Sequence, residues 1–236
     1  MSAFSVLIGL GATLGLWQVA RSAPLNQAGR WVDSGLGVLV GMLIGARMGY
    51  VGLHPAYYAA HPWEWAQLWM GGYTAWGAAA GGLLAAGLLA AALRRSFLLV
   101  LDGMAPLFPP LAVLGWLGCS LAGCAYGPVM GPGAWLALPL VDESGQVAAR
   151  FPLQLLAALV VLGYNWGLAA LLPRHTAPGR YAALVGLGLA GALFGVAALS
   201  AEPAPVWRGL SPDGWAAVGV TVVSVGTLIL SFVKHH

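Results

Sequence analysis

The sequence predicts an all-α integral membrane protein with seven transmembrane helices. Of its 236 residues, 60% are hydrophobic and only 7% are charged, whereas soluble domains average about 25% charged residues. The apolar residues gather into seven stretches of roughly 20 residues, the length that a helix needs to cross a bilayer. Lipid offers no partner to backbone N–H and C=O groups, so each stretch is expected to be helical. We expect residues 1–236 to form one domain.

The predicted spans differ in how regular they are. The fourth contains Pro106, Pro109 and Pro110, and proline inside a helix removes a hydrogen bond and clashes with the preceding turn. A kink or a break is therefore expected there. Glycine, at 35 residues, is abundant because membrane helices approach closely through small residues. The spans are predicted at residues 2–20, 35–53, 73–93, 97–123, 152–172, 181–200 and 212–233.

The loops predict the orientation. Cytoplasmic loops of membrane proteins carry an excess of Lys and Arg. The loops after spans 1, 3 and 5 and the C-terminal tail hold seven such residues, and the other loops hold two. We therefore expect the C-terminus in the cytoplasm and the N-terminus outside. The two longest loops, 54–72 and 124–151, then lie outside, and the first is rich in Trp and Tyr, which favour membrane interfaces. The seven are Arg21, Arg30, Arg94, Arg95, Arg174, Arg180 and Lys234, and the two are Arg150 and Arg208.

Several classes of function are not indicated. The net charge of +3 does not predict a nucleic-acid partner, because the basic residues are scattered in loops and form no basic face. No metal or cofactor is predicted. The first apolar stretch has no basic segment before it and further spans follow, so a cleavable signal peptide is not predicted. The final Lys234-His235-His236 is either natural or the remnant of a tag.

Two charged residues lie inside predicted spans. An arginine there costs about 2.5–3.5 kcal/mol on insertion scales, which makes Arg47 a candidate functional residue. It is expected either to bind a lipid phosphate, with its planar fork of donors, or to reach a backbone carbonyl or the headgroup zone. Asp102 is expected to be structural, either pairing with Arg94 or Arg95 or capping a helix.

The stretch GWLGCSLAGCAYG at 115–127 combines small residues with two cysteines. Residues five apart on a regular helix point about 140° apart, and no histidine is near to complete a zinc shell. A disulfide would require the helix to end between Cys119 and Cys124. We therefore expect both cysteines to be reduced, unbridged packing residues. The recurring glycines indicate that a neighbouring helix or a ligand approaches the backbone.

Gly118-Cys119, Gly123-Cys124 and Tyr126-Gly127 together resemble the signature of the prolipoprotein diacylglyceryl transferase family. The resemblance is good over about residues 35–157, and other motifs occur in the same order along the chain. These are Gly45-Ala46-Arg47 to Val51, His54-Pro55, His61-Pro62, Gly71-Gly72, Asp102 to Pro106, Arg150-Phe151-Pro152 to Leu155, and Gly209-Leu210-Ser211.

The resemblance implies a lipid reaction. Members of the family bind phosphatidylglycerol in a cavity open to the bilayer and move its diacylglyceryl group onto the thiol of a lipoprotein cysteine. It also implies a bacterial cytoplasmic membrane and, as partners, a phosphatidylglycerol-like lipid and a lipoprotein or another membrane protein. Arginines must hold the phosphate, and a base must deprotonate the thiol. The residues expected to bind lipid are Arg47, Arg150, Gly118, Gly123 and Tyr126.

The chain departs from the family pattern at its polar positions. Trp116 stands where the family has an arginine, Trp76 where it has a histidine, and Ala122 where it has an asparagine. Phe151, Leu156 and Ala157 replace a histidine, a tyrosine and a glutamate. We therefore hypothesise a lipid-binding membrane protein, or a subunit of a membrane complex, whose catalysis is lost or altered. No catalytic residue is assigned. The alternative is an active transferase that uses Arg47, Arg150 and Arg208.

Overall fold

The computed structural model describes residues 3–131, 133–172, 177–204 and 206–233. Within these ranges, seven helical segments are long and apolar enough to cross a membrane, which confirms the predicted fold class. Arg174 and the Lys234-His235-His236 tail lie outside the described residues. The segments are α1 (Ala3–Ser22), α2 (Ala28–Leu53), α4 (Ala75–Ala92), α5 with α6 (Phe97–Ala122), α7 (Leu153–Leu171), α8 (Arg180–Leu199) and α9 (Pro212–Val233).

The spans agree with the sequence prediction apart from the second, which begins at Ala28 instead of residue 35. The fourth is broken at its prolines, as expected. Helix α5 (Phe97–Met104) passes through the single 3-10 turn η3 (Ala105–Leu107) into α6 (Phe108–Ala122). Pro109 and Pro110 fall in the first turn of α6, where the N–H group that proline lacks would have no helical partner.

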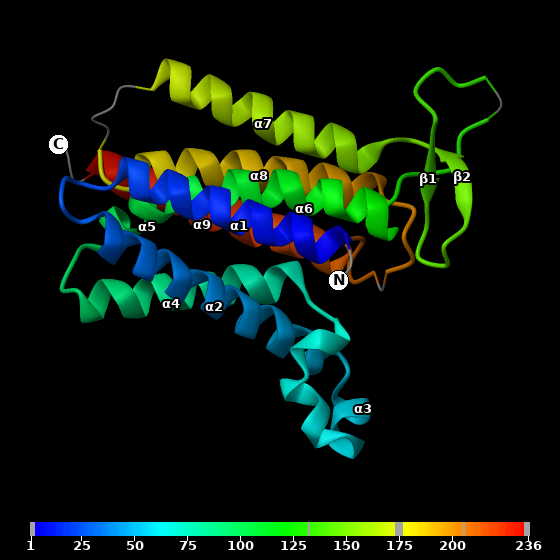
Figure 1. The fold of residues 1–236 in the computed structure, drawn as a ribbon, viewed down its shortest axis with the longest axis horizontal. Helices are drawn as coiled ribbons and strands as arrows, with labels where there is room; N and C mark the ends of the chain where they lie inside the picture. Colours follow the sequence, from blue (N-terminus) through cyan, green and yellow to red (C-terminus); the bar gives the residue numbers. More distant parts are fainter. Residues whose placement is uncertain (1–2, 132, 173–176, 205, 234–236) are drawn as a thin grey trace.

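The helices run side by side along the long axis of the molecule (Figure 1). Helices α2 and α4 form a pair at one edge, α7 lies at the opposite edge, and α1, α6, α8 and α9 lie between them. Both long loops are at one end. One contains α3 (Pro55–Ala60), η1 (Pro62–Ala66) and η2 (Leu68–Met70), and the other forms the antiparallel hairpin β1 (Leu138–Val141) and β2 (Val147–Arg150). The N-terminal end of α1 lies at this end and the C-terminal end of α9 at the other.

Glycines bring α2 and α4 into backbone contact. A Cβ atom at Gly45 would lie 2.7 Å from the Cα atom of Gly81, and one at Gly81 would meet the carbonyl oxygen of Gly41. Gly186 of α8 instead packs against the side chain of Ser224 of α9. The expectation that glycines let the helices approach closely is therefore confirmed at these positions.

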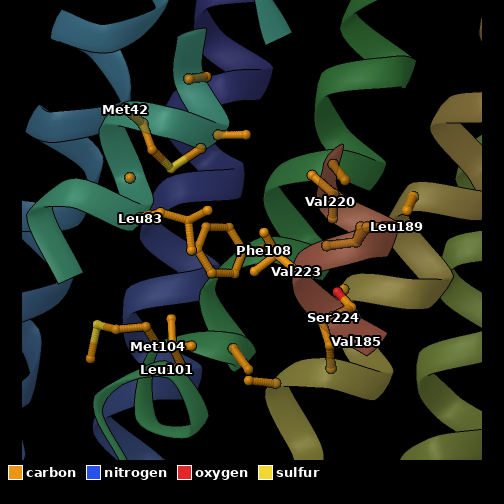
Figure 2. Close-up of a pocket in the computed structure, with 18 of the residues that line it drawn as sticks. Met42, Leu83, Leu101, Met104, Phe108, Val185, Leu189, Val220, Val223 and Ser224 are labelled. Atoms are coloured by element: carbon orange, nitrogen blue, oxygen red, sulfur yellow. The ribbon is translucent and has the colours of Figure 1, made fainter. Parts of the chain in front are cut away.

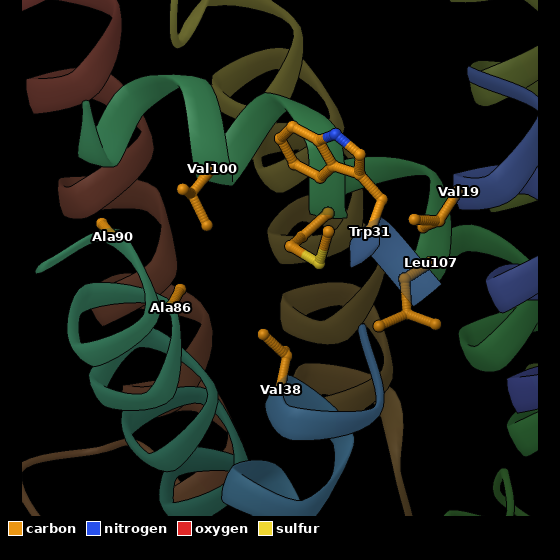
Figure 3. Close-up of a cluster of buried hydrophobic side chains, with 8 residues drawn as sticks. Val19, Trp31, Val38, Ala86, Ala90, Val100 and Leu107 are labelled. Carbon is orange, nitrogen blue, oxygen red and sulfur yellow. The ribbon is translucent and has the colours of Figure 1, made fainter. Parts of the chain in front are cut away.

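The main apolar cluster lies where α1, α2, α4, α5 and η3 meet (Figure 3). The ring of Trp31 covers Gly103, whose missing side chain leaves the room for it. Nearby, the carboxylate of Asp102 accepts hydrogen bonds from the N–H groups of Gly179 (2.6 Å) and Ala182 (2.8 Å). Asp102 thus has a structural role, as expected, but it caps α8 rather than its own helix. The buried members of the cluster are Val19, Trp31, Val38, Ala86, Ala90, Val100, Met104 and Leu107.

Candidate functional site

A cavity of about 360 Å³ lies among α2, α4, α5, α6, α8 and α9 (Figure 2). This volume is within the usual range of about 300–1,000 Å³ for small-molecule sites. The wall is formed mostly by Ala, Leu, Val, Met and Phe side chains, and no charged residue is among those that line it. Its polar groups are the hydroxyls of Ser224 and Thr227 on α9 and the indole of Trp116 on α6. The cavity therefore suits an apolar ligand.

Arg150 and Tyr126 come together beside the hairpin. The Arg150 guanidinium forms an ion pair with Asp142 (2.8 Å) and lies 4.5 Å above the centre of the Tyr126 ring. The Tyr126 hydroxyl donates to Glu143 at 3.1 Å. Burial, together with this bond to Glu143, raises the pKa of Tyr126, so the phenol is protonated at neutral pH. Arg150 is itself buried, and its Nε atom has no hydrogen-bond partner among the described residues.

Gly118 and Gly123 are crowded by the protein itself. A Cβ atom at Gly118 would lie 2.9 Å from the ring of Phe4 on α1. At Gly123 it would lie 2.5 Å from the carbonyl carbon of Asp142 in the hairpin. The neighbouring-helix alternative raised from the sequence is therefore observed at Gly118, while lipid binding by Gly118 and Gly123 stays a prediction.

The expectation of unbridged cysteines is wrong, because Cys119 and Cys124 form a disulfide with Cα atoms 4.8 Å apart. A regular helix would direct the two side chains apart. Here α6 ends at Ala122, and Gly123 adopts a left-handed conformation with φ of 74°. The chain therefore turns back between the cysteines and brings their sulfur atoms together.

Arg47 is almost fully buried, with 2% of its surface exposed. Its guanidinium donates to four backbone carbonyls in the loop after α2, those of Glu64, Trp65, Gly71 and Gly72. The Nε bond to Trp65 is 3.0 Å long. The carbonyl alternative raised from the sequence is therefore observed, while binding of a lipid phosphate stays a prediction. The contacts of Arg47 lie in the 54–72 loop and those of Arg150 lie in the 124–151 loop.

The family described as prolipoprotein diacylglyceryl transferase matches residues 1–228 of the chain. The chain belongs to this family. Three bacterial relatives named phosphatidylglycerol–prolipoprotein diacylglyceryl transferase are similar to it. The protein of Methylibium petroleiphilum is 36% identical over 64% of this chain and 58% of its own length. Those of Paraburkholderia xenovorans and Bordetella parapertussis are 31% and 30% identical, each over 82% of this chain and 74% of the relative.

A small apolar cluster lies beside the cavity and includes Trp116, which also lines the cavity. Its buried residues are Leu153, Ala157 and Val196, and Trp116 and Phe151 pack against them. Trp116, Ala157 and Phe151 are three positions at which the resemblance described above implies polar residues. All three belong to this one apolar cluster.

Other residues that support this region were not predicted from the sequence. Glu202 accepts a hydrogen bond from the N–H group of Ala125 at 2.6 Å. Gln154 is fully buried and donates to the carbonyl of Cys124 at 3.0 Å. Asp142 holds Arg150. A signal for Asp142 was present, because Asp-Glu-Ser-Gly at 142–145 is a turn sequence that brings residues on either side of it opposite each other.

Seven apolar helices and the bacterial relatives indicate a multi-pass protein of the inner membrane.

Proposed function

We propose that this member of the family holds the acyl chains of a phospholipid in the cavity and does not carry out the transfer named in its relatives. The observation that carries the proposal is the apolar contact formed by Trp116, Phe151 and Ala157. At three positions where the resemblance implies polar residues, this chain has Trp116, Phe151 and Ala157, which belong to one apolar cluster. A site that still moved protons and stabilised charge would not be expected to gain such a cluster.

Transfer of a diacylglyceryl group makes two demands on a site. A base must remove the thiol proton, and positive or hydrogen-bonding groups must stabilise the negative charge on the leaving phosphate. The cavity wall offers the hydroxyls of Ser224 and Thr227 and one indole, none of which is a base at neutral pH. Arg150 is paired with Asp142, and Arg47 would have to give up carbonyl partners to bind a phosphate.

The same features suit binding. Acyl chains in the bilayer are already in an apolar environment, so their binding depends on van der Waals packing against the cavity wall. A headgroup can be oriented by few polar contacts. If Arg150 takes part, its buried guanidinium must first be uncovered to reach a headgroup oxygen. The expected ligand is a phosphatidylglycerol-like phospholipid.

Filling the cavity tests the binding. Ala112 lines it on α6, so Ala112→Trp should reduce the phospholipid that copurifies with the protein, measured by mass spectrometry after delipidation and reconstitution with phosphatidylglycerol. Ala170→Trp is the matched control, because Ala170 is exposed on α7, which contributes no residue to the cavity wall. Equal retention of phosphatidylglycerol by the two variants and the unchanged protein would contradict the proposal.

An active transferase is the second candidate, and the names of the relatives favour it. It would use Arg47, Arg150 and Arg208 to hold the phosphate. Arg208 has no ion-pair partner among the described residues and stacks on Trp207 at 4.8 Å. Rescue of a transferase-depleted strain separates the two candidates.

A further inference from the structure

The loop between α2 and α4 exposes an unusual amount of aromatic surface. We call residues 54–72 the aromatic segment; it contains α3, η1 and η2. Trp63 and Trp69 are 87% and 82% exposed, and Tyr57, Trp65 and Met70 are about half exposed. Large apolar side chains gathered on a surface indicate a binding face for a membrane or another protein.

The aromatic segment is not a loose loop. Arg47 of α2 holds it through the carbonyls of Glu64, Trp65, Gly71 and Gly72. The ring of Tyr50 covers Gly72, where a Cβ atom would lie 2.5 Å from it. Two α2 side chains thus fix where the segment lies relative to the end of the helix.

These contacts set its depth in the membrane. Helix α2 has 26 residues, so at about 1.5 Å per residue it is longer than the hydrocarbon core of about 30 Å. Arg47 lies six residues before the last residue of α2, which is about 9 Å along the axis. The headgroup layer is of similar thickness, at about 5–8 Å on each side. With the C-terminal end of α2 placed at the outer edge of the headgroup layer, the carbonyls held by Arg47 lie near the boundary between hydrocarbon and headgroups. The segment runs beside this end of α2 (Figure 1).

The charges of the aromatic segment indicate that it does not depend on anionic lipids. Residues 54–72 contain no Lys or Arg, and their acidic residue, Glu64, accepts a hydrogen bond from Tyr57 at 2.8 Å. Surfaces that bind anionic lipids do so through clusters of Lys and Arg. Trp and Tyr, in contrast, favour the headgroup level through their amphipathic rings, whatever the lipid charge. Both ends of the segment continue into spans, α2 and α4, and Arg47 and Tyr50 hold it beside the end of α2.

We propose that the aromatic segment is a membrane-surface anchor, which buries Trp63 and Trp69 in the headgroup layer of the bilayer independently of lipid charge. Arg47 acts as a positioning residue that holds the segment at this depth. This inference is independent of the cavity and of whether the protein catalyses transfer.

Fluorescence quenching in vesicles tests the anchor. The full chain is reconstituted in phosphatidylcholine, and the signal of the two tryptophans is obtained by subtracting the spectrum of a Trp63→Phe/Trp69→Phe variant. We expect loss of this signal with lipids brominated near the headgroup end of the acyl chains, and no loss with aqueous iodide on both sides of the membrane. The result should be the same when part of the phosphatidylcholine is replaced by phosphatidylglycerol.

Two single variants calibrate the quenchers. Trp135 is 89% exposed in the 124–151 loop, so the signal removed by Trp135→Phe should be quenched by iodide. Trp166 is exposed on α7, so the signal removed by Trp166→Phe should respond to brominated lipid. Iodide quenching of Trp63 and Trp69 to the same extent as Trp135 would overturn the anchor. That result is expected if the segment binds a protein partner, because the partner is absent from the vesicles and the two tryptophans would face water. If brominated lipid quenches Trp63 and Trp69 only when phosphatidylglycerol is present, the proposal that the segment binds independently of lipid charge is overturned.

The role of Arg47 is tested in the same assay. Arg47→Gln removes the charged fork, so Trp63 and Trp69 should become open to iodide. Unchanged protection from iodide would overturn the positioning role. If Arg47→Gln does not fold, the comparison with Trp135 and Trp166 in the unchanged chain still decides whether the segment is an anchor.

Discussion

Replacing Gly45 by alanine should loosen the pair formed by α2 and α4. The added Cβ atom would lie 2.7 Å from the Cα atom of Gly81 and closer still to the carbonyl oxygen of Gly77. Optimal carbon–carbon contacts are about 3.5–4.0 Å, so the helices must separate by roughly 1 Å, a gap that removes about half of the attraction between facing atoms. Backbone cannot rotate away as a flexible side chain can. We expect a loss of about 1–3 kcal/mol in the free energy of unfolding.

Unfolding in detergent micelles, followed by circular dichroism against temperature or added sodium dodecyl sulfate, measures the effect. Gly163→Ala is the matched control, because Gly163 lies on α7 and a Cβ atom there would meet nothing within 4 Å. The control should unfold at or above the midpoint of the unchanged protein, since alanine favours helix over glycine. Equal midpoints for Gly45→Ala and Gly163→Ala would refute the packing argument.

Three further predictions follow from other parts of the molecule. Replacing Cys119 and Cys124 by serine should lower the free energy of unfolding by about 2 kcal/mol, the value for a short loop. The unchanged protein should resist alkylation of its cysteines unless it is reduced first. Ready labelling without reductant would contradict the disulfide. Hydrogen bonds from Ser144 and Gln146, with the Arg150 charge, hold the pKa of Asp142 below its ordinary value of 3.8. The stability it contributes is therefore complete above that pH and lost as the pH falls through the lower folded value. The protection of hairpin amides against exchange, corrected for the intrinsic rate at each pH, should fall there, and Asp142→Asn should abolish this pH dependence. A reporter fused to the C-terminus should be active in the cytoplasm, and activity only outside would reverse the proposed orientation.

The spans could be predicted because each depends on a local property. A run of about 20 apolar residues is required in lipid whatever the neighbouring helices do. The break in the fourth span followed in the same way from Pro106 and Pro109. The early start of α2 at Ala28 was missed because residues 28–34 include Arg30 and Asp33, which are too polar for a span but compatible with a helix that extends beyond the membrane.

The site was harder to predict because it depends on the backbone. The partners of Arg47 are backbone carbonyl oxygens. Every residue carries such an oxygen, so no sequence pattern predicts which ones Arg47 binds. The disulfide depended on the left-handed Gly123, and a glycine in a glycine-rich run does not reveal which residue ends the helix. The clustering of Trp116 with Ala157 joins residues on α6 and α7, although each replacement could be recognised singly.

Rescue of a bacterial strain depleted of its own diacylglyceryl transferase tests the central claim most directly. The positive control is the Paraburkholderia xenovorans relative, 31% identical to this chain, and membrane expression of both proteins is checked by immunoblot. The proposed function predicts growth with the relative and no growth with this chain, because Trp116, Phe151 and Ala157 supply neither a base nor a positive charge at those positions. Growth at the normal rate on this chain alone would contradict the account and show that the remaining arginines suffice for transfer.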